Sequence, residues 1–131
     1  MTQQKIVEYW LSKAKNELRS ANIMFDNEDY LYTGFMCHQC IEKALKAYYV
    51  HVKNERQPYD HRLHELSSSS GLSNLMDECH KSIIEKLDPL YLKARYDDYK
   101  NKISSLLTKN YCQSLLNETE ELLTWIIKMM E

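Results

Sequence analysis

The sequence predicts an all-α fold, an up-and-down bundle of four main helices plus one short extra helix. Apolar residues recur at steps of three and four in four segments, which is the spacing of one face of a helix. The 131 residues include only 2 glycines and 2 prolines, so few positions favour tight turns. No segment shows the alternation of apolar and polar residues that is typical of a strand. Because a chain of this length suits one hydrophobic core, residues 1–131 are expected to form a single domain.

The first two main helices are expected over residues 3–26 and from about residue 30 to residue 53. The polar residues between them include side chains suited to capping the second helix. The apolar stripe of the first helix consists of Val7, Trp10, Leu11, Ala14, Leu18, Ala21 and Phe25. That of the second consists of Cys37, Ile41, Ala44, Leu45, Tyr48 and Val52. On another face of the second helix, His38, Glu42 and Lys46 follow one another at four-residue steps.

The short extra helix and the third main helix are expected in the middle of the chain. After a loop over residues 54–60, we expect Asp60 to cap a short helix around Leu63. A third main helix is expected to open at Ser73 and to continue to Leu87, because apolar residues again recur at helical spacing.

The last third of the chain begins with Asp88-Pro89, which has the form of an N-cap followed by proline and predicts a break. A final helical stretch is expected to reach about Tyr96, and a polar, irregular segment to follow over residues 97–107. Thr108 is expected to cap the last main helix. The broad apolar face of this helix comprises Cys112, Leu115, Leu116, Leu122, Leu123, Ile126, Ile127 and Met130. Because the face is wide enough for a partner as well as the core, we expect a homodimer.

Charge and hydropathy exclude some functional classes. The chain has 17 basic and 19 acidic residues, a net charge of -2, which disfavours nucleic-acid binding by the whole surface but is compatible with a local basic patch. No apolar run reaches the roughly 20 residues that a membrane span requires, and the first residues lack the pattern of a signal peptide. The cytoplasm is therefore the expected location, where the 4 cysteines are expected to be reduced.

Three segments, taken in order, carry a more specific pattern. Residues 35–47 contain the arrangement Gln-x-x-Glu-Lys-x-Leu-Lys-Ala, and residues 91–96 contain Tyr-x-x-x-Arg-Tyr. Between them, His61-Arg62-Leu63 has the form of a turn that leads into a helix. Together with Trp10 and Ala14 of the first helix, the segments resemble, in this order and over nearly the whole chain, the HEPN (higher eukaryotes and prokaryotes nucleotide-binding) domain of the stand-alone prokaryotic type.

The resemblance implies a helical module that binds a nucleotide or the phosphate of RNA and acts with a partner protein. That partner is expected to be a small nucleotidyltransferase, in a pair of the toxin–antitoxin kind. The implied site is a groove between the second helix and the Arg-Tyr segment. Its ligand-binding residues are expected to be Gln39, Glu42, Lys43, Lys46, His61, Arg95 and Tyr96. In this arrangement lysine and arginine face phosphate, Glu42 orients the cations, and a tyrosine ring offers a surface on which a base stacks. No catalytic residue and no cofactor is assigned.

The chain departs from the family pattern after Arg95. Asp97 stands where the family usually has proline. Ribonuclease members of the wider family have a histidine four to six residues after the arginine, whereas this chain has Lys100, Asn101 and Lys102. Neither an amide nor an ordinary lysine replaces imidazole as an acid or base at neutral pH, so the sequence favours binding over catalysis.

Two alternatives to this hypothesis remain open. One is a metal-independent ribonuclease that uses Arg95, or else Arg56 with His61, although chance alone yields roughly half a match to the Arg–His spacing in such a chain. The other is a ligand-free dimerisation module. In that case Glu42 and Lys46 are only a surface ion pair, or Glu42 pairs with Arg95. Tyr96 is expected to pack in the core, and the 10 tyrosines, spread over several faces, are expected to be core and boundary residues.

The cysteines invite a zinc interpretation that their spacing disfavours. Cys37 and Cys40 are expected inside a continuous helix, and Cys79 is directly followed by His80. A structural zinc site usually takes spaced ligands from a turn. Buried cysteines that pack as small apolar residues explain the pattern better, and no metal site is predicted.

Overall fold

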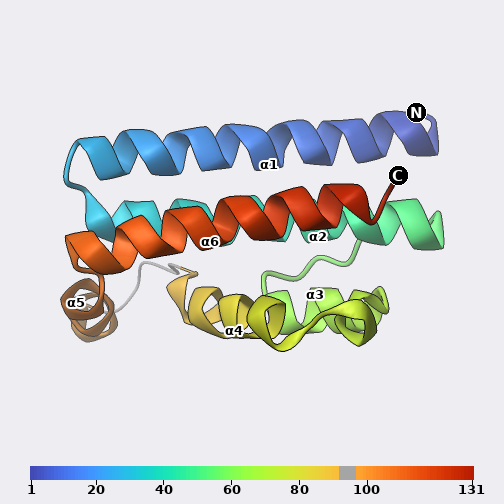
Figure 1. The fold of residues 1–131 in the computed structure, drawn as a ribbon. Coiled ribbons are helices and arrows are strands. Elements are labelled where there is room, and N and C mark those ends of the chain that lie inside the picture. The colour runs from blue at the N-terminus through green and yellow to red at the C-terminus, as the bar shows by residue number, and fades with distance from the viewer. Residues whose placement is uncertain (92–96) are drawn as a thin grey trace.

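The computed structural model describes the backbone of residues 1–91 and 97–131, and the side chains of residues 1–91 and 101–131. All of its described secondary structure is helical, which confirms the all-α prediction. Three long helices, α1 (Gln3–Asp26), α2 (Tyr30–Lys53) and α6 (Lys109–Lys128), lie side by side (Figure 1). The shorter helices α3 (Leu63–Ser69), α4 (Glu78–Leu87) and α5 (Asp97–Leu106) form a layer beneath them, with the 3-10 turns η1 (Leu72–Leu75) and η2 (Asp88–Leu90) on either side of α4.

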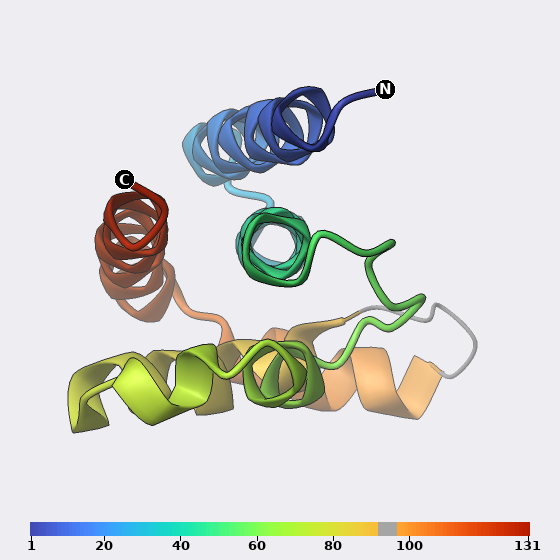
Figure 2. The same ribbon diagram turned by 90° about the vertical axis from the view of Figure 1, so that its right-hand side faces the viewer.

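Helix α2 occupies the centre of the bundle. Figure 2 shows α1, α6 and the layer of shorter helices around it, with the chain that leaves its C-terminus passing along the remaining side. Ile41 and Leu45 of α2 are completely buried, and so is Leu87 of α4. Leu115 of α6 is only 1 % exposed. The contact between α1 and α2 is the most extensive between any two helices. Helix α2 is therefore the element against which the other helices pack.

A capping side chain precedes each of the three long helices. Thr2 Oγ1 accepts a hydrogen bond from Lys5 N at 3.2 Å before α1. Asp29 Oδ1 accepts one from Tyr32 N at 3.3 Å before α2, and Thr108 Oγ1 one at 3.2 Å before α6. Each cap satisfies a backbone N–H that has no partner within its helix. The predicted bounds of α1 and α2 and the cap at Thr108 are therefore confirmed.

The third main helix begins later than predicted. Residues 72–75 form the 3-10 turn η1 and Met76 is extended, so Ser73 does not open an α-helix. Helix α4 starts at Glu78 because Asp77 supplies the cap: its Oδ1 accepts from His80 N at 2.9 Å. The His80 ring completes the motif by accepting from Asp77 N at 3.4 Å.

The prediction that Asp60 caps the short helix is wrong. Helix α3 begins at Leu63, and its cap comes from Asp88, 25 residues further along the chain. The Asp88 carboxylate accepts hydrogen bonds from Leu63 N at 2.7 Å and from His64 N at 3.2 Å. Asp60 instead accepts from Arg62 N at 2.9 Å. A cap supplied by a distant residue has no signature in the local sequence.

The prediction of a break at Asp88-Pro89 is confirmed, whereas that of an irregular segment over residues 97–107 is wrong. After the short turn η2, Tyr91 is extended (φ -67, ψ 112), so the helical path ends there. The remainder of the predicted stretch, including Arg95 and Tyr96, lies outside the described residues. Residues 97–106 form α5, because Ile103 and the following Leu107 are buried at helical spacing and anchor it to the core.

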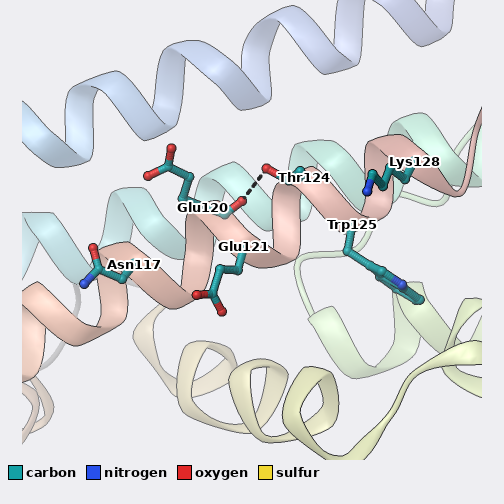
Figure 3. Close-up of a pocket in the computed structure, with 6 residues that line it drawn as sticks. All are labelled: Asn117, Glu120, Glu121, Thr124, Trp125 and Lys128. Atoms are coloured by element: carbon teal, nitrogen blue, oxygen red, sulfur yellow. Dashed lines mark hydrogen bonds between the residues drawn. The ribbon is translucent and has the colours of Figure 1, made fainter.

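The apolar face of α6 packs within the chain. Most of its residues belong to the core, with Ile127 and Met130 partly buried against it. The outward face is polar, and Figure 3 shows Glu120, Glu121 and Lys128 around a shallow hollow beside Trp125. The apolar face is wide because α6 contacts α1, α2 and α4. A homodimer stays a prediction, and the breadth of this apolar face no longer supports it, because the chain's own core covers the face.

The three buried cysteines are part of the core. Burial raises the pKa of the Cys37 thiol to about 12 and that of the Cys112 thiol to about 11, and it raises the Cys40 pKa as well. These thiols are therefore protonated at neutral pH and pack as small apolar groups. In the described part of the chain, no helix is long and apolar enough to cross a membrane.

Candidate functional site

A buried carboxylate, that of Glu42, lies at the centre of a polar cluster on α2. Glu42 is 0 % exposed, although glutamate is rarely buried unless it is paired. Because α2 turns once every 3.6 residues, Gln39 and Lys46 lie on the same side of the helix as Glu42. Lys43 is the next residue after Glu42 and reaches its carboxylate with a long side chain. The backbone of a single helix therefore brings four of the predicted site residues together.

The Glu42 carboxylate contacts three basic side chains. Its Oε2 lies 3.2 Å from Lys43 Nζ and 3.1 Å from Lys46 Nζ, and its Oε1 lies 2.9 Å from His61 Nδ1. Burial by itself would raise the pKa of Glu42, but Lys43, His61 and Lys46 together outweigh burial and hold the pKa below its ordinary value. Glu42 is therefore ionised at neutral pH. The pair with Lys46 is largely buried, so it is more than the surface ion pair that a ligand-free module would imply.

His61 reaches Glu42 from the segment before α3. An ionised carboxylate only accepts hydrogen bonds, so the Nδ1 atom of His61 carries a proton. In the neutral ring, the lone pair is then on Nε2, for which the described residues provide no hydrogen-bond partner. The side chain is 29 % exposed. His61 is therefore the member of the cluster best placed to meet a ligand.

A second histidine, His38, holds the backbone of His61. His38 is 0 % exposed, and its Nε2 lies 3.0 Å from the His61 carbonyl oxygen. Because a carbonyl only accepts, Nε2 is the protonated nitrogen. Burial lowers the pKa of His38, so the ring is neutral and its Nδ1 is an acceptor. The side-chain amide of Gln39 lies 3.2 Å from that Nδ1. Because Nδ1 accepts, the amide faces it with its N–H group and not with its oxygen.

Aromatic rings continue the site along the outer side of α2, and they form what we call the aromatic row: Tyr32, Phe35, Tyr91, His61 and Tyr59. Successive ring centroids are 6.4, 6.1, 4.3 and 5.6 Å apart. The central contact is a stack, with the rings of His61 and Tyr91 inclined by 12°. Tyr59 at the end of the row is 94 % exposed, which differs from the core or boundary role predicted for the tyrosines.

The comparisons with known proteins assign the family. A model of the HEPN domain matches residues 7–130. This chain belongs to the HEPN family. The crystal structure of TT1696 from Thermus thermophilus is similar to this HEPN domain with a TM-score of 0.75 and 21 % sequence identity, over 93 % of this chain and 96 % of that chain. The structure of ST0689, an archaeal HEPN homologue, gives a TM-score of 0.75 and 19 % identity, over 95 % and 98 %. At these identities the two structures support the fold alone. The search of curated proteins gave no match.

The HEPN domain brings together five of the seven predicted site residues. Those five are Gln39, Glu42, Lys43, Lys46 and His61. Arg95 and Tyr96 lie outside the described residues, and so does any pairing of Arg95 with Glu42. Arg56, the arginine of the alternative Arg–His pair, is exposed in the loop after α2.

Sequence reasoning did not assign His38, Trp10 or Tyr91 to the site. His38 lies four residues before Glu42, so its helical spacing was a usable signal. Trp10 of α1 lies under Lys46, whose Nζ is 5.5 Å from the ring centroid. Tyr91 begins the Tyr-x-x-x-Arg-Tyr motif, but the sequence did not show that it contacts His61 or that Trp10 contacts Lys46, because both contacts arise from tertiary packing.

Proposed function

We propose that this HEPN domain binds a nucleotide or an RNA phosphate beside Glu42 and acts with a partner protein. The observation that carries the proposal is the excess of positive charge around one buried carboxylate. Glu42 contributes one negative charge, while Lys43 and Lys46 contribute two positive charges, so the cluster keeps a net positive charge even when His61 is neutral. In surroundings of low polarity an uncompensated charge is costly, and a bound anion would compensate it.

The outer edge of the cluster offers suitable donors to a phosphate. The Lys43 side chain is 11 % exposed and that of His61 29 %, so both extend further outward than Lys46 at 7 %. A protonated His61 donates from Nε2 while Nδ1 still donates to Glu42. Lys46, which lies slightly deeper than Lys43, would then attract the phosphate through its charge and not through a direct hydrogen bond.

The aromatic row favours a nucleotide over a simple inorganic anion. Tyr59 lies edge-on to His61 and is almost fully exposed, so one face of its ring is open to a base. Stacking of a base on an aromatic ring contributes about 1–3 kcal/mol and tolerates any base. Such a ligand would place its phosphate at Lys43 and His61 and its base at Tyr59.

The proposed partner is a small nucleotidyltransferase in a toxin–antitoxin-like pair, as the family resemblance implies. Co-expression with a nucleotidyltransferase encoded beside this chain, followed by size-exclusion chromatography, tests the pairing. A complex that elutes as one species is the expected result, and two separate peaks would contradict it. Sedimentation equilibrium of the isolated chain tests the homodimer.

Calorimetric titration with ATP, GTP and a short RNA tests the binding site. We expect Lys43→Ala to weaken binding about tenfold, the effect of losing one charge-assisted hydrogen bond. Lys81→Ala is the matched control, because Lys81 is an exposed lysine of α4 that pairs with Glu78 at 3.9 Å. Arg95→Ala tests the predicted contribution of the Arg-Tyr segment. If no ligand binds, or if both lysine variants weaken binding equally, the proposed site is wrong.

A thermal unfolding experiment separates this proposal from a ligand-free dimerisation module. A ligand that binds only the native state stabilises it by about 2.7 kcal/mol at a concentration one hundred times its dissociation constant. We therefore expect millimolar nucleotide to raise the unfolding temperature of the unmodified chain more than that of Lys43→Ala. Equal unfolding temperatures with and without nucleotide would favour the dimerisation module.

One observation favours a second candidate function, metal-independent cleavage of RNA. The bond from His61 Nδ1 to Glu42 fixes the ring tautomer and leaves the Nε2 lone pair to act as a base, an arrangement that recurs in acid–base catalysis. Cleavage of cellular RNA in the presence of a chelator, lost in His61→Ala and retained in His64→Ala, would support this function. An RNA that stays intact under these conditions would exclude it.

A further inference from the structure

We infer that Asp88 is a positioning residue of the Glu42 site, because it fixes both the backbone that carries His61 and the ring that stacks on His61. The inference rests on the proposed function for its ligand, but its geometry can be tested without one. Among the described residues, Asp88 makes no hydrogen bond or ion pair with the side chain of Glu42, Lys43, Lys46 or His61. It acts on the site through the segments that it holds, while its charge also favours the protonated form of His38.

The first of these segments is the start of α3. Asp88 Oδ1 accepts from Leu63 N at 2.7 Å, and Oδ2 accepts from His64 N at 3.2 Å. These two N–H groups follow His61 by only two and three residues. Backbone N–H donors to an ionised carboxylate form strong hydrogen bonds, so Asp88 fixes the chain directly after His61.

The second segment leads from Asp88 to Tyr91. Asp88 is the first residue of η2, and Leu90 within that turn is buried, with only 1 % of its surface exposed. The next residue, Tyr91, places its ring 4.3 Å from that of His61, with 12° between the planes. One side chain therefore links the two chain segments whose rings form the stack. If the link is lost, the segments can shift relative to each other even when each keeps its own conformation.

An ordinary helix cap would not require this arrangement. Asp60 lies close in sequence to the start of α3, but its carboxylate is used on Arg62, through the backbone N–H at 2.9 Å and the guanidinium at 3.0 Å. Arg62 itself, at the cap position of α3, makes no capping bond with its side chain. The cap of a seven-residue helix is thus supplied by the one residue that also begins the turn to Tyr91.

The test compares Asp88→Ala and Asp88→Asn with Asp77→Ala. Asp77 is a matched control, because it also caps a short helix through one carboxylate, accepting from His80 N at 2.9 Å, but it lies outside the Glu42 site. Long-range proton–nitrogen spectra of the histidine rings report the tautomer of His61 and the ring-current shift from Tyr91. Calorimetry with ATP and thermal unfolding are measured on the same samples.

We expect Asp88→Ala to move the His61 ring signals and to weaken ATP binding about tenfold, since small misplacements of a binding group are costly. Asp88→Asn keeps an acceptor for Leu63 N and should restore most of both properties. Asp77→Ala should lower the unfolding temperature about as much as Asp88→Ala does, without changing the His61 ring signals or ATP binding. The inference is overturned if Asp88→Ala leaves the His61 signals unchanged, or if Asp77→Ala changes them equally. If the unmodified chain binds none of ATP, GTP and the short RNA but the His61 signals respond as expected, the proposed function fails while the role of Asp88 stands.

Discussion

His61 Nδ1 lies 2.9 Å from Glu42 Oε1, and this hydrogen bond joins the segment before α3 to the middle of α2. The two lysines that contact Glu42 belong to its own helix, so they would lie near it in any fold that keeps α2 intact. His61 is 19 residues away and meets Glu42 only in the folded chain. The bond therefore ties the proposed ligand site to the tertiary structure of the HEPN domain.

Removal of the buried carboxylate should destabilise the fold. Glu42→Ala leaves the charges of Lys43 and Lys46 close together without their anion, and breaking a buried pair from one side costs about 3 kcal/mol. Urea unfolding at pH 7 measures the change in the free energy of unfolding. Glu118→Ala serves as the control, because it breaks the more exposed pair with Lys86 at 3.0 Å and should cost less than about 1 kcal/mol. Similar losses in both variants would show that the Glu42 cluster contributes no more than a surface ion pair.

Acid should destabilise the protein in two steps, first through His38 and then through Glu42. Burial lowers the pKa of His38 from 6.5, so the unfolded chain takes up the proton more readily and stability falls as the pH drops below that value. Glu42, whose pKa is lowered from 4.5 in the folded state, adds a second loss at lower pH.

The variant His38→Gln tests the first step, because its amide can still donate to the His61 carbonyl oxygen but does not titrate. Urea unfolding between pH 7.5 and pH 5 should show a smaller loss of stability in this variant than in the unmodified chain. His64→Gln is the control, because its side chain is exposed on α3 and the variant should follow the unmodified chain. Parallel curves for His38→Gln and the unmodified chain would rule out this role of His38.

Much of the fold was predictable from local patterns. The bounds of α1 and α2 follow from apolar stripes and from the capping residues Thr2 and Asp29, which act on N–H groups three residues away. Helix α5 was missed because, among the side chains described from residue 101 to residue 107, only Ile103 and Leu107 are buried. Two residues produce too weak a periodicity to be recognised without knowledge of what they pack against.

The candidate site shows the same division between local and tertiary information. Glu42 and Lys46 could be grouped from their spacing, because residues four apart share a side of a helix, and Lys43 is adjacent to Glu42 in the sequence. The stack of His61 on Tyr91 and the cap that Asp88 gives to α3 join residues 24 or more positions apart. No periodicity in the sequence reports such contacts. Sequence reasoning therefore found the charges of the site but not the residues that hold them in place.

The turn between α1 and α2 offers a stabilising substitution. Glu28 has φ +62, a left-handed conformation that costs an ordinary L-residue roughly 1–2 kcal/mol. Glycine adopts it freely, although it also makes the unfolded chain more flexible, so we expect Glu28→Gly to raise the free energy of unfolding by about 0.5 kcal/mol. Asn54, at φ +51 after α2, is the comparison, because asparagine already tolerates this conformation and Asn54→Gly should gain less. A loss of stability in Glu28→Gly would show that its side chain matters more than its backbone.

Close packing at Gly34 fixes the distance between α2 and the end of α5. A Cβ atom at this position would lie 2.9 Å from Leu107 Cδ1 and 3.3 Å from Leu90 Cδ1. Alanine favours a helix over glycine by about 1 kcal/mol, but both leucines are buried, so the overlap should outweigh this gain. We expect Gly34→Ala to lower the free energy of unfolding by about 1 kcal/mol.

A double-mutant cycle with Leu107→Ala shows whether the overlap is the cause. Leu107→Ala alone should cost about 2–4 kcal/mol, because it leaves a cavity in the core. In the Gly34→Ala background its cost should be smaller by about 1 kcal/mol, since the new methyl group occupies part of that cavity. Urea unfolding of the four proteins measures the coupling. Additive losses would mean that Leu107 moves aside without cost and that Gly34 is not required for the approach of α5 to α2.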